Sequence, residues 1–276
     1  MASLDRAPGE GSHAEVQGAR PEVSDFDAAL TDCAMLDEEA LGRPWSWRGR
    51  PLDVREALYL TLEDVQEAHA RASAGQLPES RRILALAQRA FGDLRGLLSG
   101  LPADLLDRAP REGEWPVRET LRHMLWVERR YALSTRHAID RADGEPIRLS
   151  EDRLPTLAQM DVGGEIGAVL ARIGEAREET TRRLGDVVPA AMTRPSVWAG
   201  HEIDVRFRLH RFAVHIVEHT IQCEKALRAL AWCPTEGRRI ARRIAAALGE
   251  VEGLGAVTEA REVEARLAER LASVRV

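Results

Sequence analysis

The chain has 276 residues, of which 44% are apolar and 30% charged, and its formal net charge at pH 7 is −6. This composition is typical of a soluble globular protein, and the acidic balance argues against a nucleic-acid binder that works by neutralising phosphates. Three scattered cysteines do not make a disulfide framework, and no apolar run approaches the roughly 20 residues of a membrane span, so we expect a cytoplasmic protein.

The first 79 residues are expected to lie outside the main fold. Residues 1–35 are rich in small and polar residues, show no sustained period and are typical of a disordered tail. Residues 36–79 follow as an N-terminal helical extension. Within it, Trp45 and Trp47 indicate a loop that anchors on the body of the protein through its indoles. The apolar spacing then predicts a helix over residues 52–72.

Four long amphipathic segments follow, each with apolar residues at helical spacing and each bounded by loops that contain glycine or proline. They cover residues 80–99, 116–141, 166–184 and 205–231. Since no alternating run is strong enough for a strand, the pattern predicts an all-α fold built on a four-helix bundle over residues 80–233. Residues 234–276 form a C-terminal helical extension with helices at about 236–250 and 258–273, and no internal repeat is evident.

The last bundle helix carries the most informative spacing, because His215 and His219 stand four residues apart. Four residues bring two side chains back to one face of an α-helix, one turn apart. Two imidazoles placed in this way can hold one transition metal if other elements complete the coordination shell. Spacing alone leaves a second interpretation open, in which both are hydrogen-bonded core or surface histidines.

A third imidazole, that of His123 in the second bundle helix, can meet the other two inside such a bundle. Its position at the border of the apolar stripe would not by itself have selected it. Three protein ligands leave coordination positions open, which is the arrangement of a catalytic metal site rather than a closed structural one. A metal bound there lowers the pKa of a coordinated water or thiol and so provides a nucleophile at neutral pH.

Two segments resemble the DinB-like family of metal-binding four-helix bundles. Residues 113–125, Gly-Glu-Trp-Pro-Val-Arg-Glu-Thr-Leu-Arg-His-Met-Leu, are similar to the family's Trp-Ser-Val-Arg-Glu…His run, with Pro116 in place of the usual serine. Residues 215–222, His-Ile-Val-Glu-His-Thr-Ile-Gln, are similar to its His-x-x-x-His run in the fourth helix. The resemblance covers about residues 80–232 and leaves the terminal extensions unexplained.

The resemblance implies that His123, His215 and His219 are a metal triad that binds a divalent ion such as Zn, Ni or Fe. Similar members of the family include thiol S-transferases and a mycothiol-dependent maleylpyruvate isomerase. They imply a metal-dependent transferase that activates a low-molecular-weight thiol, of the mycothiol or bacillithiol type, for attack on an electrophilic small molecule. A small-molecule substrate, no nucleic-acid or membrane partner, and a homodimer are the expected associations.

Two other function classes stay open at this point. The first is a non-catalytic metal-binding stress-response protein of the same fold, because much of the family has no assigned reaction. The second is a structural bundle in which the histidines are only packed. Whether the chain is an enzyme is therefore left open by the sequence.

Two polar residues near the histidines are candidate catalytic residues. Gln222 can orient a water or donate to substrate, or it can make a structural bond behind the site. Glu218 can accept from an imidazole N–H or act as a base, or it can form a surface pair with Arg211 or another cation. Trp115 and Trp198, in the loops before the two histidine helices, are expected to line a substrate cavity or to plug the bundle end.

Two further side chains near the triad are expected to have no part in it. His210 lies about 140° around the helix from His215 and is expected to take a surface or core position. Cys223 lies within the apolar stripe and is expected to be a core residue rather than a nucleophile.

Overall fold

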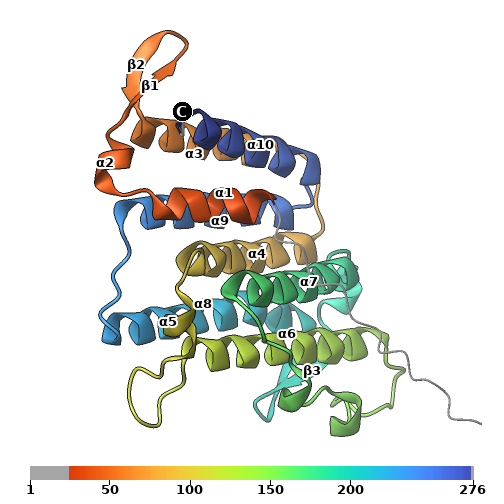
Figure 1. Ribbon diagram of the computed structural model, residues 1–276. Helices are drawn as coiled ribbons and strands as arrows, with labels where there is room; N and C mark the ends of the chain where they lie inside the picture. Colours follow the sequence, from red (N-terminus) through yellow and green to blue (C-terminus); the bar gives the residue numbers. More distant parts are fainter. Residues whose placement is uncertain (1–24, 275–276) are drawn as a thin grey trace, which may run out of the picture.

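The computed structural model describes residues 25–274 and is built almost wholly of helices (Figure 1). The helices are α1 (Asp25–Met35), α2 (Glu38–Leu41), α3 (Val54–Ala72), α4 (Glu79–Leu98), α5 (Ala103–Asp107), α6 (Val117–Asp140), α7 (Ile166–Leu184), α8 (Val205–Ala229), α9 (Glu236–Gly253) and α10 (Val257–Val274). Three single 3-10 turns are η1 (Glu151–Arg153), η2 (Leu157–Gln159) and η3 (Pro189–Ala191). The all-α fold class is confirmed. Within the described residues, no helix combines the length and apolarity needed to cross a membrane.

Helices α4, α6, α7 and α8 form the expected four-helix bundle. Both α4 and α6 pack against α7 and α8, so α4 and α6 occupy diagonal corners although they follow one another along the chain. The large side chains at the centre of this bundle include Leu84, Phe91, Leu94, Leu121, Leu125, Ile173, Leu209 and Phe212. Burial of such a continuous apolar core is the main source of the bundle's stability.

The remaining long helices, α1, α3, α9 and α10, surround a second hydrophobic core. Helix α1 contributes Phe26, Leu30 and Cys33, which are all buried there. The expectation of a disordered tail over residues 1–35 is therefore wrong for residues 25–35, while residues 1–24 lie outside the described part of the chain. An 11-residue helix offers too few turns for its apolar stripe to stand out in a segment of small and acidic residues.

Two β-hairpins correct the expectation that the chain has no strand. Strands β1 (Pro44–Trp47) and β2 (Arg50–Asp53) pair antiparallel, and so do β3 (Pro195–Trp198) and β4 (His201–Asp204). Both turns have positive φ at two successive residues, Arg48 and Gly49 in one hairpin and Ala199 and Gly200 in the other. A two-residue hairpin turn with this backbone favours glycine at its second position. Strands of four residues are too short for alternation to be visible in the sequence.

The hairpins belong to an internal repeat that was not recognised in the sequence. Residues 43–54, Arg-Pro-Trp-Ser-Trp-Arg-Gly-Arg-Pro-Leu-Asp-Val, correspond in place to residues 194–205, Arg-Pro-Ser-Val-Trp-Ala-Gly-His-Glu-Ile-Asp-Val. The next-to-last residue of each unit is an aspartate, Asp53 or Asp204. Its side chain accepts a hydrogen bond from the backbone N–H of the third residue of the helix that follows. The valine after the aspartate donates its backbone N–H to the carbonyl of the first arginine in both units. Helix α3 is thus the counterpart of α8.

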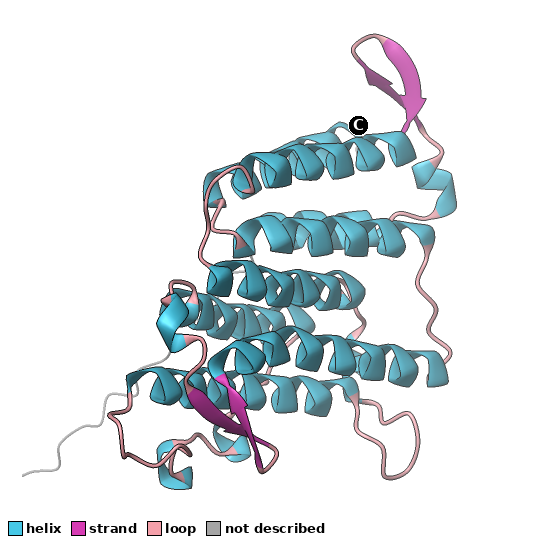
Figure 2. Cartoon of the chain, turned by 180° about the vertical axis from the view of Figure 1, so that it is seen from behind, coloured by secondary structure: helices cyan, strands magenta, loops and turns pink. Residues whose placement is uncertain are grey.

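Helices α4 and α9 repeat one another in the same way. Helix α4 begins Glu-Ser-Arg-Arg-Ile and α9 begins Glu-Gly-Arg-Arg-Ile, and residues 91–97, Phe-Gly-Asp-Leu-Arg-Gly-Leu, match residues 248–254, Leu-Gly-Glu-Val-Glu-Gly-Leu. The packing neighbours then match α10 to α6 and α1 to α7. The second group of helices therefore has the arrangement of the first with a circularly permuted chain order, in which α9, α10, α1 and α3 correspond to α4, α6, α7 and α8. Its hairpin lies at the opposite end of the molecule (Figures 1 and 2).

Four glycines bring α4 and α9 into backbone contact where the two groups of helices meet. Gly92 and Gly96 of α4 face α9, and Gly249 and Gly253 of α9 face α4. A Cβ atom on Gly92 would stand 2.2 Å from the carbonyl oxygen of Ala245. No side chain fits into that space, so the close contact depends on residues without one.

A partly buried carboxyl in α10, that of Glu264, makes the stability of this second group depend on pH. Burial, together with Glu252, raises the pKa of Glu264 to about 7 from its ordinary value of 4.5. Between those two pH values the folded chain holds a proton that the unfolded chain releases, so stability falls as pH rises through 7. We expect Glu264→Gln to raise the free energy of unfolding at pH 8 by about 1–3 kcal/mol and by much less at pH 5, measured by urea unfolding. The exposed Glu269→Gln is the control on the same helix, and an equal gain for E264Q at both pH values would contradict the prediction.

Candidate metal centre

Helix α8 places two histidines inside the bundle. His215 and His219 are 8% and 9% exposed, although imidazole is a polar group. The same face of α8 is anchored in the core by apolar side chains, those of Leu209, Phe212, Ile216 and Cys223. The predicted four-residue spacing therefore directs both imidazoles inward, toward α6.

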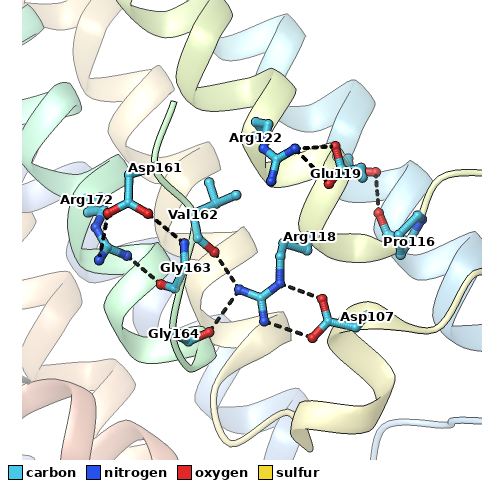
Figure 3. Close-up of polar contacts among 11 residues, drawn as sticks. Asp107, Pro116, Arg118, Glu119, Arg122, Asp161, Val162, Gly163, Gly164 and Arg172 are labelled. Atoms are coloured by element: carbon cyan, nitrogen blue, oxygen red, sulfur yellow. Dashed lines mark hydrogen bonds and ion pairs between the residues drawn. The ribbon is translucent and has the colours of Figure 1, made fainter. Parts of the chain in front are cut away.

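Helix α6 carries the third histidine, and Arg118 fixes the start of that helix. Its guanidinium donates to both carboxylate oxygens of Asp107, at the end of α5, and to the carbonyls of Val162 and Gly164, which precede α7 (Figure 3). Arg118 thus ties the first turn of α6 to two other segments. His123 follows five residues later, so this anchor gives the Trp-Pro-Val-Arg-Glu motif a structural role in placing the imidazole.

The three imidazoles converge. Nε2 of His123 and Nε2 of His215 lie 3.4 Å apart, and the ligand nitrogens of His123, His215 and His219 all lie within 4.8 Å of one another. Two nitrogens bound tetrahedrally to one Zn²⁺ at 2.0–2.1 Å would stand about 3.3–3.4 Å apart. The donor set and the spacing therefore fit a single divalent transition ion. Within residues 25–274, no other group of three or more His, Cys, Asp or Glu side chains has this geometry.

Burial favours the neutral form of these imidazoles. It is the largest cause that lowers the pKa of His215, to about 3, and the neighbouring His219, His123 and Arg211 lower it further. Burial is also the largest cause that lowers the pKa of His123, and Glu218 opposes it. Only a neutral imidazole nitrogen has a lone pair for a metal, so the lowered pKa values of His215 and His123 favour metal binding at neutral pH.

Gln222 lies behind the triad. The Nδ1–H of His219 donates to its amide oxygen over 2.8 Å, which leaves Nε2 of the same ring as the nitrogen with a free lone pair. This contact corresponds to the second role considered for Gln222, a structural bond behind the site, and the prediction that it orients His219 for a metal follows from it.

Gln222→Leu is expected to weaken metal binding about 10- to 100-fold, because partners that orient a ligating histidine contribute to affinity on that scale. Competition with a chromophoric chelator measures the change. Gln222→Glu keeps an acceptor oxygen at this position and should restore most of the affinity. A chain whose metal affinity is the same with leucine as with glutamine would show that the hydrogen bond does not position His219.

A cavity of about 320 Å³ lies beside the triad. Three aromatic side chains in its wall are those of Trp126, Tyr131 and Trp198. The ring of Trp126 is 5.6 Å from that of His123, and the ring of Tyr131 is 5.7 Å from that of His215. The cavity wall does not include the histidines themselves, but it shares with them the rings of Trp126 and Tyr131, and its volume suits a small ligand.

A family model described as the DinB superfamily matches residues 86–223, which is half of the chain and includes the whole triad. The chain belongs to the DinB superfamily. Among solved structures, YfiT from Bacillus subtilis, described as a probable metal-dependent hydrolase with an unusual four-helix bundle topology, is similar at 14% identity and a TM-score of 0.45. That similarity covers 58% of this chain and 93% of YfiT. No curated protein matches the chain.

The other candidates in this DinB-superfamily chain lie in different surroundings. The side chain of Glu218 is 64% exposed and lies 3.8 Å from the guanidinium of Arg211, as in the surface pair considered from the sequence. Trp198 lines the cavity, and its indole N–H donates to the hydroxyl of Tyr131 over 2.9 Å. Trp115 lies 5.5 Å from the ring of His123 and is 45% exposed.

His210 and Cys223 lie as expected. His210 is exposed on α8, away from the triad. Cys223 is buried in the core, and burial raises the pKa of its thiol to about 12, which excludes it as a thiolate nucleophile near neutral pH.

Three residues that line the cavity were not predicted from the sequence, namely Trp126, Tyr131 and Arg208. The position of Arg208 could have been predicted, because it precedes His215 by seven residues, or about two turns, and therefore lies on the same face of α8. The two aromatic residues lie on α6 at spacings equally typical of core packing. Their role emerges only from the position of the hairpin β3–β4 over them.

The second group of helices lacks the triad of the DinB superfamily. In α3, Asp64 takes the place of His215 and Ala68 that of His219, counted from the valine that begins each helix. Asp64 makes ion pairs of 2.8 Å and 2.7 Å with Arg266 and Arg270 of α10. An ion pair thus stands where the first bundle has its imidazoles, and one metal ion per chain is the expected stoichiometry.

Proposed function

We propose that this chain is a metal-dependent transferase that joins a low-molecular-weight thiol, of the mycothiol or bacillithiol type, to an electrophilic small molecule. The observation that carries the proposal is an open site of three converging imidazoles beside a cavity of about 320 Å³. Three protein ligands leave room for a fourth donor, and a closed structural site would not. The resemblance to thiol S-transferases of the DinB-like family supports a thiol as that donor.

A Zn²⁺, Ni²⁺ or Fe²⁺ ion held by His123, His215 and His219 supplies Lewis acidity and lowers the pKa of a thiol that coordinates it. Gln222 holds His219 in its ligating tautomer. The aromatic side chains of the cavity wall provide an apolar surface for the carbon skeleton of the electrophile. In a substitution, a sulfur–carbon bond forms, the thiol proton passes to solvent, and the leaving group departs with the electron pair of the bond that breaks. With an α,β-unsaturated electrophile, the sulfur bonds to the β carbon, the carbon–carbon π bond breaks, and the α carbon takes up a proton from solvent, so that nothing leaves.

The test starts with elemental analysis of the full chain, purified without chelators or a nickel column. The chain loaded with Co²⁺ is then titrated with mycothiol or bacillithiol, and its absorption spectrum reports thiol coordination. The conjugation assay uses 1-chloro-2,4-dinitrobenzene, a neutral electrophile that releases chloride. We expect one metal ion per chain, a spectral change on adding thiol, and thiol-dependent product that disappears in His219→Ala.

The non-catalytic alternative predicts a different result for the same experiment. A chain that binds one metal ion, but whose spectrum and reactivity do not respond to either thiol, would overturn the transferase proposal and support a metal-binding protein without this reaction. A chain that binds no metal would leave only the packed-histidine interpretation.

A further inference from the structure

Arg208 is a buried cation in the wall of the cavity beside the triad. Arg208 is only 6% exposed, and one N–H group of its guanidinium donates to the carbonyl of Val197 over 2.9 Å. Its Nε–H has no acceptor, and over the described part of the chain no carboxylate pairs with it. A buried charge without a counter-ion is costly, so such a group calls for a partner of opposite charge.

The guanidinium remains charged at neutral pH. Burial lowers the pKa of Arg208, but only to about 10. The ring of Tyr131, 4.7 Å from the guanidinium carbon, provides a cation–π contact that compensates part of the burial cost. Neither contact neutralises the charge, so the cavity presents a positive group to whatever it binds.

The other two arginines of the wall already make ion pairs. Arg130 and Arg148 both pair with Glu151, over 2.6 Å and 2.9 Å. Glu151 is the one carboxylate in this wall among the residues described. The wall therefore carries three guanidinium groups and one carboxylate, and Arg208 is the one of the three that pairs with no carboxylate among the residues described.

A purely structural role does not account for Arg208. Its bond to Val197 links α8 to the hairpin β3–β4, but the repeated unit makes the same hairpin and helix without it. At the position of α3 that corresponds to Arg208, the chain has Ala57. The hairpin β1–β2 keeps the same register and the same aspartate cap there. An arginine is thus not needed to hold this hairpin.

We propose that Arg208 binds a carboxylate of the electrophilic substrate, so that the chain acts on small organic acids. The inference rests on the proposed function for the identity of the cavity as the substrate site. The planar guanidinium fits the two oxygens of a carboxylate, which it can bind through two parallel N–H···O bonds. The aromatic wall accepts the carbon skeleton.

The position of Arg208 also constrains the substrate. It precedes His215 by seven residues, or about 10.5 Å along the helix axis. With the carboxylate on Arg208, the electrophilic carbon is expected to lie several bonds away, toward the imidazoles. A two-carbon acid is too short to contact both groups.

The binding test compares benzoate with benzamide, which have nearly the same shape and differ in charge. Isothermal titration is carried out on the full chain before and after removal of metal with a chelator, because carboxylates also coordinate metals. We expect benzoate to bind at least about tenfold more tightly than benzamide in both forms, as for a charge-assisted pair. Arg208→Met should abolish this preference. The matched control is Arg206→Met on the same helix, since Arg206 pairs with Glu79 outside the cavity wall.

Three results would overturn the proposal. They are equal affinity of the wild-type chain for the two probes, benzoate binding that vanishes with the metal, and benzoate binding that is unchanged in R208M. If circular dichroism shows that R208M does not fold, Arg208→Lys takes its place, because it keeps the cation but loses the planar fork. R208K should weaken benzoate binding measurably, and unchanged binding counts against the proposal.

A kinetic comparison separates this inference from the proposed function. In the thiol-transfer assay, an α,β-unsaturated acid and its methyl ester are compared in the wild-type chain and in R208M. Preference for the acid, lost in R208M while the neutral 1-chloro-2,4-dinitrobenzene still reacts, supports both. Thiol transfer without any preference for the acid overturns the role of Arg208 alone. Selective benzoate binding without any thiol transfer overturns the transferase and leaves Arg208 as the carboxylate-binding group of the cavity.

Discussion

His219→Ala is expected to lower the metal content of the purified chain at least tenfold. The variant removes one of three nitrogens that lie within 4.8 Å of one another, and it also leaves Gln222 without its hydrogen-bond partner. Two remaining imidazoles hold a divalent ion too weakly to survive purification. Mass spectrometry of the metal, normalised to protein concentration, gives the stoichiometry directly.

The matched control for this variant is His210→Ala. His210 is on the same helix but exposed, so its loss should leave the metal content near one ion per chain. The two substitutions have the same size and the same effect on total charge. Unchanged stoichiometry in H219A, or equal losses in both variants, would contradict the triad as the metal site.

The helices of the bundle were predictable because each one buries a single face. Their apolar positions recur at three and four residues over five turns or more, and glycine or proline stands at the ends. The expected segments at residues 80–99, 116–141, 166–184 and 205–231 each contain one of the observed helices α4, α6, α7 and α8, apart from its first residue in α4. An apolar pattern that repeats with helical spacing over five turns predicts a helix and hardly fits any other secondary structure.

The candidate site was predictable only in part. The spacing of His215 and His219 directs both rings to one face, so their proximity follows from helix geometry alone. The position of His123 depends on how α6 is rotated against α8, which Arg118 and its partners fix through tertiary contacts. It was found through a motif of the family and not from its place on the helical wheel.

The hairpins, the internal repeat and the cavity wall were not predicted from the sequence, because each depends on contacts between residues far apart in the chain. The hairpins have strands of four residues, and their similarity to one another becomes evident once both are seen to precede a capped helix. The circularly permuted chain order separates the halves of the second group of helices by some 160 residues of intervening chain, so no tandem period exists. The cavity wall likewise combines residues from α6, α8 and the hairpin β3–β4. That Arg208 lines a cavity is evident only when these elements are seen together.

Gly92→Ala is expected to destabilise the chain by about 1–3 kcal/mol or more, the usual cost of overpacking. An alanine in a helix normally adds stability relative to glycine, by about 0.5–1 kcal/mol. Here the new Cβ would stand 2.2 Å from the carbonyl oxygen of Ala245 and 2.9 Å from its carbon. Both atoms belong to backbone, so relief requires α4 and α9 to move apart over their whole contact.

Gly174→Ala in α7 is the matched control, because a Cβ there meets only the ring of Phe91, at 3.6 Å, which is ordinary van der Waals contact. It should be neutral or stabilising, so the two identical substitutions are expected to differ in sign. Urea unfolding of both variants measures the difference. If G92A is as stable as G174A, the helices tolerate a wider separation than the structure has. If G92A is less stable yet still binds one metal ion when folded, the contact between α4 and α9 stabilises the fold without shaping the triad, since all three histidines lie on α6 and α8.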